Sequence, residues 1–323
     1  MENIESARVK KLNIQKLNIS EIDGHLNHFY FSEKLKYYCL LLSWSKMTNV
    51  DLEVTLIPEI VSKIANSKLM EIPAIAIYYQ IYLTFIDPTD ESHFFNLKNL
   101  IKNQLHLFPP EEARDIMNSA INYTIQKQNQ GNLNYSKENF ELWNEALTIG
   151  IILTNNELSP WAFKNIITLS LRLSEFEWTE NFINEWGQKI PKEFRLNAIN
   201  YNLASLYFYR KEYNKAIPLL QQVQYDEINY GLSSKSILLA IFYELDEFDS
   251  LNSIFESFKI FLIRNKALTD DRKKLYLNLI KFTKAISDNQ SNISKLKNIK
   301  KEIIATQVAS KSWLLEKVDE LLN

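Results

Sequence analysis

An aromatic residue recurs every 35 positions through the middle of this chain. Trp143, Trp178, Tyr213 and Phe248 follow this spacing, and a glutamate precedes each of the last three. Apolar stretches with helical spacing flank these positions. A fixed period in this range is typical of helical repeat arrays, in which each helix pair buries its apolar face against the next pair. The spacing therefore predicts an all-α chain built from stacked antiparallel helix pairs.

The composition favours the same fold class. Only five glycines occur in 323 residues, whereas an average protein contains about 7% glycine. Hairpins of β-strands and phosphate-binding loops need glycine at positive φ, so a chain this poor in glycine is best built from helices joined by short polar turns. Hydrophobic residues make up 46% of the chain and charged residues 24%, which excludes disorder of the whole chain.

A polar segment at residues 129–135 predicts a linker, because it contains glycine and almost no apolar anchor. We expect an irregular helical N-terminal subarray over residues 1–128. We expect a more regular array over residues 136–323, whose last helices cap the stack with a polar face. Helices are predicted in the N-terminal part at Glu5–Ile19 and Ser32–Lys46, and a further helix begins at Pro73.

Several features of the N-terminal part favour a cytoplasmic protein. The first residues are acidic and lack the apolar segment of a secretory signal. The most apolar stretch, residues 72–86, is too short to cross a bilayer and predicts a buried core helix. Cys39 is the single cysteine, so no internal disulfide can form, and its apolar surroundings predict a buried structural thiol.

Residues 197–230 resemble a tetratricopeptide repeat. In that family the first helix carries a leucine, a small residue and a tyrosine, and Leu203, Ala204 and Tyr207 fill these places. The second helix carries an aromatic residue followed three positions later by alanine, as Tyr213 and Ala216 do. The small residues let the two helices approach closely, and the large ones fill the groove between them. The neighbouring units match the repeat pattern only in part. The resemblance as a whole covers residues 162–265.

This resemblance implies a right-handed α-solenoid that binds a protein or short peptide on its concave face. The first helices of the pairs line that face in the family. By position, the expected groove residues are Tyr201, Ser205, Phe208, Tyr209, Ser236, Ala240 and Tyr243. The family's carboxylate clamp uses a lysine and asparagines at these places, whereas this chain has tyrosine and serine, so we do not expect that function. An alternative role for the tyrosines is packing between neighbouring repeats.

The charge distribution gives a second candidate function. Residues 256–323 contain 14 Lys and Arg against 8 Asp and Glu, and the rest of the chain contains 23 against 31. Such an excess is usually a solvated helix face. It is also compatible with binding of nucleic acid or another acidic partner. The densest group of basic residues is Arg264, Lys266, Arg272, Lys273 and Lys274.

No sequence pattern indicates an enzyme. Phosphate-binding glycine loops, zinc-protease motifs and nucleophile elbows are all missing from the sequence. His25 and His28 are three residues apart, but Asp23 is the only further ligand nearby, and a metal site needs more. His93 follows two aspartates in residues 87–93, where turn and capping roles explain the carboxylates. We therefore expect a non-enzymatic interaction protein without metal or cofactor.

Overall fold

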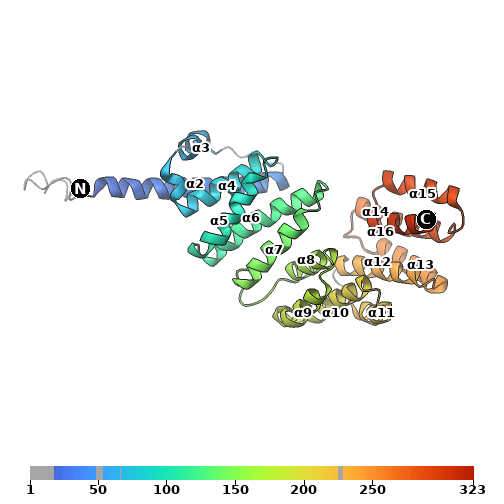
Figure 1. Cartoon of the computed structure of the whole chain (residues 1–323). Helices are drawn as coiled ribbons and strands as arrows, with labels where there is room; N and C mark the ends of the chain where they lie inside the picture. Colours follow the sequence, from blue (N-terminus) through green and yellow to red (C-terminus); the bar gives the residue numbers. More distant parts are fainter. Residues whose placement is uncertain (1–17, 49–53, 66, 225–227) are drawn as a thin grey trace, which may run out of the picture. The chain divides into compact units, whose positions relative to one another are not determined.

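The computed structural model describes residues 18–48, 54–65, 67–224 and 228–323, and within these it is helical throughout (Figure 1). Fifteen α-helices, α2 to α16, and three short 3-10 turns make up the described part, which contains no strand beyond one isolated bridge between Thr154 and Glu157. This confirms the all-α prediction for these residues. The chain forms two compact units, residues 1–152 and 153–323.

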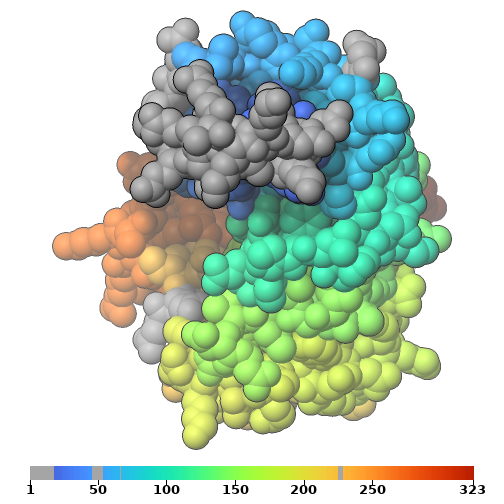
Figure 2. All heavy atoms as spheres, turned by 90° about the vertical axis from the view of Figure 1, so that its left-hand side faces the viewer, coloured from blue at the N-terminus to red at the C-terminus, as the bar shows by residue number. Residues whose placement is uncertain are grey.

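Unit 1 is organised around α4. Its elements are α2 (Ile19–Thr48), α3 (Ile57–Ala65), α4 (Pro73–Ile86), α5 (Ser92–Gln104), α6 (Pro110–Asn129) and α7 (Tyr135–Thr148). Helix α4 packs against α2, α5 and α6, and α6 packs against α7. The space-filling view shows α3 in light blue above the teal atoms of α5 (Figure 2). The core between these helices is built from fully buried side chains such as Leu35, Ile77, Phe94 and Ile116.

The first described helix of unit 1 is longer than the sequence pattern predicts. Helix α2 runs unbroken for 30 residues and includes Gly24. The predicted start at Ser32 is wrong, because its hydroxyl donates to the carbonyl of Phe29 (3.0 Å) inside the helix instead of capping a new one. Of the predicted helix Glu5–Ile19, residues 5–17 lie outside the described part of the chain.

The predicted linker at 129–135 is a tight turn within unit 1. It joins α6 to α7, which pack against each other. The side-chain amide of Gln128 donates to the carbonyl of Tyr135 (3.3 Å), and the Lys127 ammonium lies 5.8 Å from the centre of the Tyr135 ring. These contacts hold the two sides of the turn together, and the boundary between the compact units follows Ile152.

The prediction of a buried structural thiol is confirmed. Cys39 is 5% exposed and its Sγ donates to the carbonyl of Tyr78 on α4 (3.4 Å). Burial raises the pKa of this thiol far above its ordinary value, so it stays protonated and unreactive. The apolar stretch that begins at residue 72 forms the buried helix α4, as predicted. None of the helices in the described ranges has the length and apolar character needed to cross a membrane.

Unit 2 is a succession of helices, each packed against the next. Its members are α8 (Pro160–Arg172), α9 (Phe176–Trp186), α10 (Lys192–Tyr209), α11 (Tyr213–Gln222), α12 (Ile228–Glu244), α13 (Phe248–Arg264), α14 (Asp270–Ser287), α15 (Ile293–Ala305) and α16 (Lys311–Leu322). The even-numbered helices also pack against one another, α8 with α10, α10 with α12, α12 with α14 and α14 with α16. The even-numbered helices therefore form a shared layer.

Three hairpins of unit 2 turn in the same way. In each, a residue with left-handed backbone follows the first helix, a glutamate comes next, and an aromatic residue begins the second helix. The glutamate N–H donates to the carbonyl five residues earlier, at 2.9, 2.8 and 3.0 Å along the chain, which satisfies an end carbonyl of the first helix. The three turns are Ser174-Glu175-Phe176, Lys211-Glu212-Tyr213 and Asp246-Glu247-Phe248.

These turns correct the assignment of the aromatic period. Phe176, and not Trp178, occupies the place of Tyr213 and Phe248, because Trp178 lies two residues further into α9. Trp143 lies in the second half of α7, away from any such turn. Only Tyr213 and Phe248 of the four aromatic residues are therefore equivalent. An aromatic spacing can be read in more than one register, and the backbone hydrogen bonds decide between them.

Candidate binding face of unit 2

The predicted groove residues lie on α10 and α12, in the shared layer of even-numbered helices, but they differ in exposure. Tyr201, Ser205 and Tyr243 are buried, at 7%, 7% and 9%. Tyr209 is 42% exposed, and Phe208 and Ser236 are half-buried. The groove itself stays a prediction, and only the last three residues have substantial surface with which to touch a ligand.

Lys164 on α8 organises the polar centre of this face. Its ammonium nitrogen lies 4.8 Å from the ring centre of Tyr201 and 5.4 Å from that of Tyr230, and 3.3 Å from the hydroxyl of Ser233. One cation thus bridges α8, α10 and α12, with two aromatic faces supplying cation–π attraction. Sequence reasoning missed Lys164, because the unit that contains it matches the repeat pattern only in part and nothing in the sequence places it beside Tyr201.

Tyr201 has a packing role at this centre. Its ring meets that of Tyr230 edge to face, with centroids 5.1 Å apart. Burial raises the pKa of Tyr201, and hydrogen bonds from Ser233 and Ser205 oppose the rise, so the phenol is neutral at ordinary pH. Ser205 donates to the backbone carbonyl of Tyr201 (2.9 Å). Neighbouring helices enclose its ring, which leaves little of it available to a ligand.

The accessible part of the face lies at the C-terminal end of α10. The Phe208 ring contacts the rings of Tyr209 and Tyr213, with centroid distances of 5.9 and 6.0 Å. Tyr209 is the most exposed member of this group. Ser236 donates to the carbonyl of Leu232 (2.8 Å), which leaves its hydroxyl oxygen able to accept from a ligand.

Tyr243 belongs to a different contact, at the end of α12. Its ring lies edge to face against that of Trp313 on α16, with centroids 5.5 Å apart, and burial raises its pKa to about 12. The adjacent residue, Glu244, accepts from the Trp313 indole (3.0 Å) and pairs with Lys317 (2.9 Å). Helix α16 therefore covers the position that the resemblance assigns to a groove.

The five basic residues of the second candidate function gather around one turn. Arg264 ends α13, Lys266 lies in the turn, and Arg272, Lys273 and Lys274 belong to the first turns of α14. Two carboxylates, Asp270 and Asp271, lie in the same first turn, and Arg272 donates to Asn229 of α12. Positive charge in this turn is thus offset locally, and nucleic-acid binding stays a prediction.

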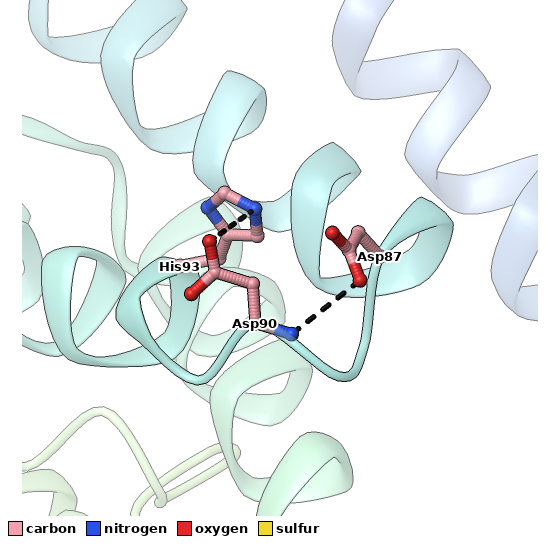
Figure 3. A group of neighbouring side chains, drawn as sticks. All are labelled: Asp87, Asp90 and His93. Carbon is pink, nitrogen blue, oxygen red and sulfur yellow. Dashed lines mark hydrogen bonds and ion pairs between the residues drawn. The ribbon is translucent and has the colours of Figure 1, made fainter.

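In unit 1, the turn between α4 and α5 brings together Asp87, Asp90 and His93, whose ligand atoms lie within 4.8 Å of one another (Figure 3). The Thr89 hydroxyl donates to Asp87 (2.6 Å), the Ser92 N–H donates to Asp90 (2.9 Å), and the His93 ring lies 3.6 Å from the Asp90 carboxylate. These contacts match the predicted turn and capping roles. The other candidate metal ligands, Asp23 and His25, have separate partners. Asp23 accepts a hydrogen bond from Asn27 (2.9 Å), while His25 lies beside Glu21 (3.8 Å).

We expect the carboxyl group of Asp90 to titrate below its ordinary pKa, because hydrogen bonds from Ser92 stabilise its charged form. A depressed folded-state pKa stabilises the fold above the unfolded pKa, and this contribution is lost as the pH falls through the folded value. In Ser92→Ala the pKa of Asp90 is expected to move back up. Carboxyl-carbon NMR titration measures it, and an unchanged pKa in the variant contradicts the assigned cause.

The described part of unit 1 also contains a cavity of about 540 Å³ between α2, α4 and α6. Ser43, Thr84 and Ser119 contribute hydroxyl groups to it, and Asn122 and Gln126 contribute amides. No carboxylate, histidine, lysine or cysteine lines it. The cavity can exchange neutral hydrogen bonds with a ligand, but it lacks a charged group for acid or base chemistry.

Comparison with protein-family models, with curated proteins and with solved structures finds no match to the chain.

Proposed function

We propose that unit 2 is a non-enzymatic scaffold that binds a protein or peptide. Its helices would form a tetratricopeptide-like, right-handed α-solenoid with the even-numbered helices on the concave side. The observation that carries the proposal is the packing order of α8 to α16, in which each helix contacts the next and every second helix contacts its counterpart. Repeat arrays stack in this way and leave one continuous layer available to partners.

The repeated turns support the same proposal. Three hairpins share one backbone conformation at the turn, with the left-handed residue and the glutamate in corresponding places. Repetition of a local structure, in addition to repetition of an aromatic spacing, is expected of units that stack with one geometry.

The chemistry of the accessible face suits an extended peptide. Tyr209 offers a large, stiff ring and Phe208 an apolar edge, and aromatic residues of this kind supply much of the affinity at protein interfaces. The preferred ligand is therefore a peptide with an apolar or aromatic side chain.

Tyr209→Ala is expected to weaken peptide binding by about tenfold, the loss typical of an interface aromatic. The best ligand from a peptide array probed with the full chain would be measured by fluorescence anisotropy. Phe248→Ala is the matched control, because Phe248 is 51% exposed but lies on the odd-numbered helix α13.

Far-ultraviolet circular dichroism would verify that both variants are folded. Equal loss of affinity in the two variants, or loss in Phe248→Ala alone, would place the binding surface away from the even-numbered helices. Tyr201 is unsuitable for this test because its burial couples binding to stability.

A further inference from the structure

Helix α2 has two apolar faces, and only one of them is buried in unit 1. Phe31, Leu35 and Cys39 are buried at 8%, 0% and 5% and follow one another at intervals of four. This face packs against α3 and α4. On the opposite face, large apolar side chains stay 37–65% exposed. The exposed stripe consists of Ile19, Ile22, Leu26, Phe29, Tyr30, Tyr37, Leu40 and Trp44.

The spacing of the exposed stripe is that of a helix-packing seam. Ile19, Ile22, Leu26 and Phe29 follow one another by three, four and three residues, and the later members continue along the same side of the helix. Scattered exposed apolar residues are normal on any protein, whereas eight of them on one side of a 30-residue helix mark an interface.

The N-terminal half of α2 is also poorly supported. No residue from Ile19 to Tyr30 is buried, and Figure 1 shows this half extending beyond the other helices of unit 1. A helical segment of about 12 residues is only marginally stable in water without packing. A partner helix that covered the stripe would supply the missing contacts.

We propose that the exposed stripe of α2 pairs antiparallel with the same stripe of a second copy of the chain, forming a homodimer. Taking about 200 Å² for a large side chain, the eight members leave roughly 800 Å² exposed, which is about what each partner contributes to a stable interface. An isologous pair presents the same patch twice, so a single self-complementary stripe is sufficient.

The order of side chains decides the direction of the pair. With two antiparallel helices centred between Phe31 and Ser32, Leu26 of one copy lies opposite Tyr37 of the other. Ile22 then lies near Leu40 of the second copy, and Glu33, which interrupts the stripe, lies near its Tyr30. In a parallel pair the two Glu33 carboxylates would face each other, and like charges in a seam are unfavourable.

The antiparallel pair would also supply packing contacts for the N-terminal half of α2. The second half of each α2 is already fixed to unit 1 through its opposite face. Each projecting N-terminal half would therefore lie on a helix held rigidly by the other copy. A parallel pair would instead place the two unsupported halves against each other.

Sedimentation equilibrium of the full chain tests the proposal. The 38.0 kDa chain is expected to sediment at twice that mass at micromolar concentration. Leu26→Glu is expected to raise the dissociation constant of the dimer by about 100-fold or more. The substitution places a carboxylate in the interface, and the twofold symmetry places one there from each copy. Leu133→Glu is the control, since Leu133 is 74% exposed in the α6–α7 turn of the same unit.

Chemical cross-linking tests the direction. When Ile22→Cys and Leu40→Cys chains are mixed, a short bismaleimide is expected to join the two kinds of chain through the introduced thiols. Prevalent links between two cysteines at position 22 would overturn the antiparallel pair. A wild-type chain that stays monomeric at about 100 µM, or a dimer insensitive to Leu26→Glu, would overturn the proposal, and binding of the monomer to phosphatidylcholine vesicles would assign the stripe to a lipid surface.

Discussion

Phe163→Ala is expected to lower the free energy of unfolding of unit 2 by about 3–5 kcal/mol, the usual cost of truncating a buried phenylalanine. Phe163 on α8 is fully buried, and its ring stacks on that of Phe182 on α9, with centroids 5.4 Å apart. Phe182 in turn stacks between Trp178 and Trp186. Alanine would leave a cavity under this aromatic column, because the two helices cannot close over it.

Urea unfolding followed by circular dichroism, with amide exchange of α8 and α9 as a local probe, measures this loss. Trp161→Ala is the matched control, since Trp161 is on the same helix and 65% exposed. The control is expected to change the unfolding free energy by no more than about 0.5 kcal/mol. If both variants lose similar amounts, the aromatic column does not hold α8 on α9.

Lys317→Met is expected to cost about 2 kcal/mol and to release α16 before the rest of unit 2, because losing one partner of an enclosed ion pair leaves the other uncompensated. Lys317 is 3% exposed, and its ammonium lies 2.9 Å from Glu244 of α12 and 2.7 Å from Glu320 of its own helix. Methionine keeps most of the side-chain length, so the loss reports mainly on the charge.

The ion pairs of Lys317 also predict that the stability of unit 2 depends on pH. Burial lowers the pKa of Lys317, but hydrogen bonds and charge attraction with Glu320 and Glu244 outweigh it, so that the net shift is upward. A raised folded-state pKa stabilises the fold fully below the unfolded value of about 10.4, and the contribution is lost as the pH rises through the folded value. The wild-type chain is therefore expected to lose more stability than Lys317→Met in strongly alkaline solution.

Amide exchange of α16 peptides, compared with α8 peptides, measures the local release. Lys301→Met provides the control, because Lys301 is an exposed residue of the neighbouring helix α15. Equal protection of α16 in wild type and Lys317→Met would show that packing on α14 and α15 is sufficient to hold this helix.

Part of the candidate binding face could be predicted from the sequence. The positions of Tyr209 and Phe208 at the end of α10 follow from helical spacing, and their partial exposure agrees with a surface role. The burial of Tyr201 and Tyr243 could not be predicted in the same way. Lys164 lies 37 residues before Tyr201, and Trp313 lies 70 residues after Tyr243, yet these are their neighbours in the fold.

Helix formation was determined by the sequence itself, because it depends on residues a few positions apart. Pro73, Pro110 and Pro160 begin their helices as a proline in the first turn should, and a left-handed residue before a glutamate follows the ends of α8, α10 and α12. Only the tertiary structure decided which apolar faces are covered, which register of the aromatic spacing is real, and where the two compact units divide. Each of these depends on contacts between residues far apart in the chain, and a local pattern contains no information about which distant helix will meet it.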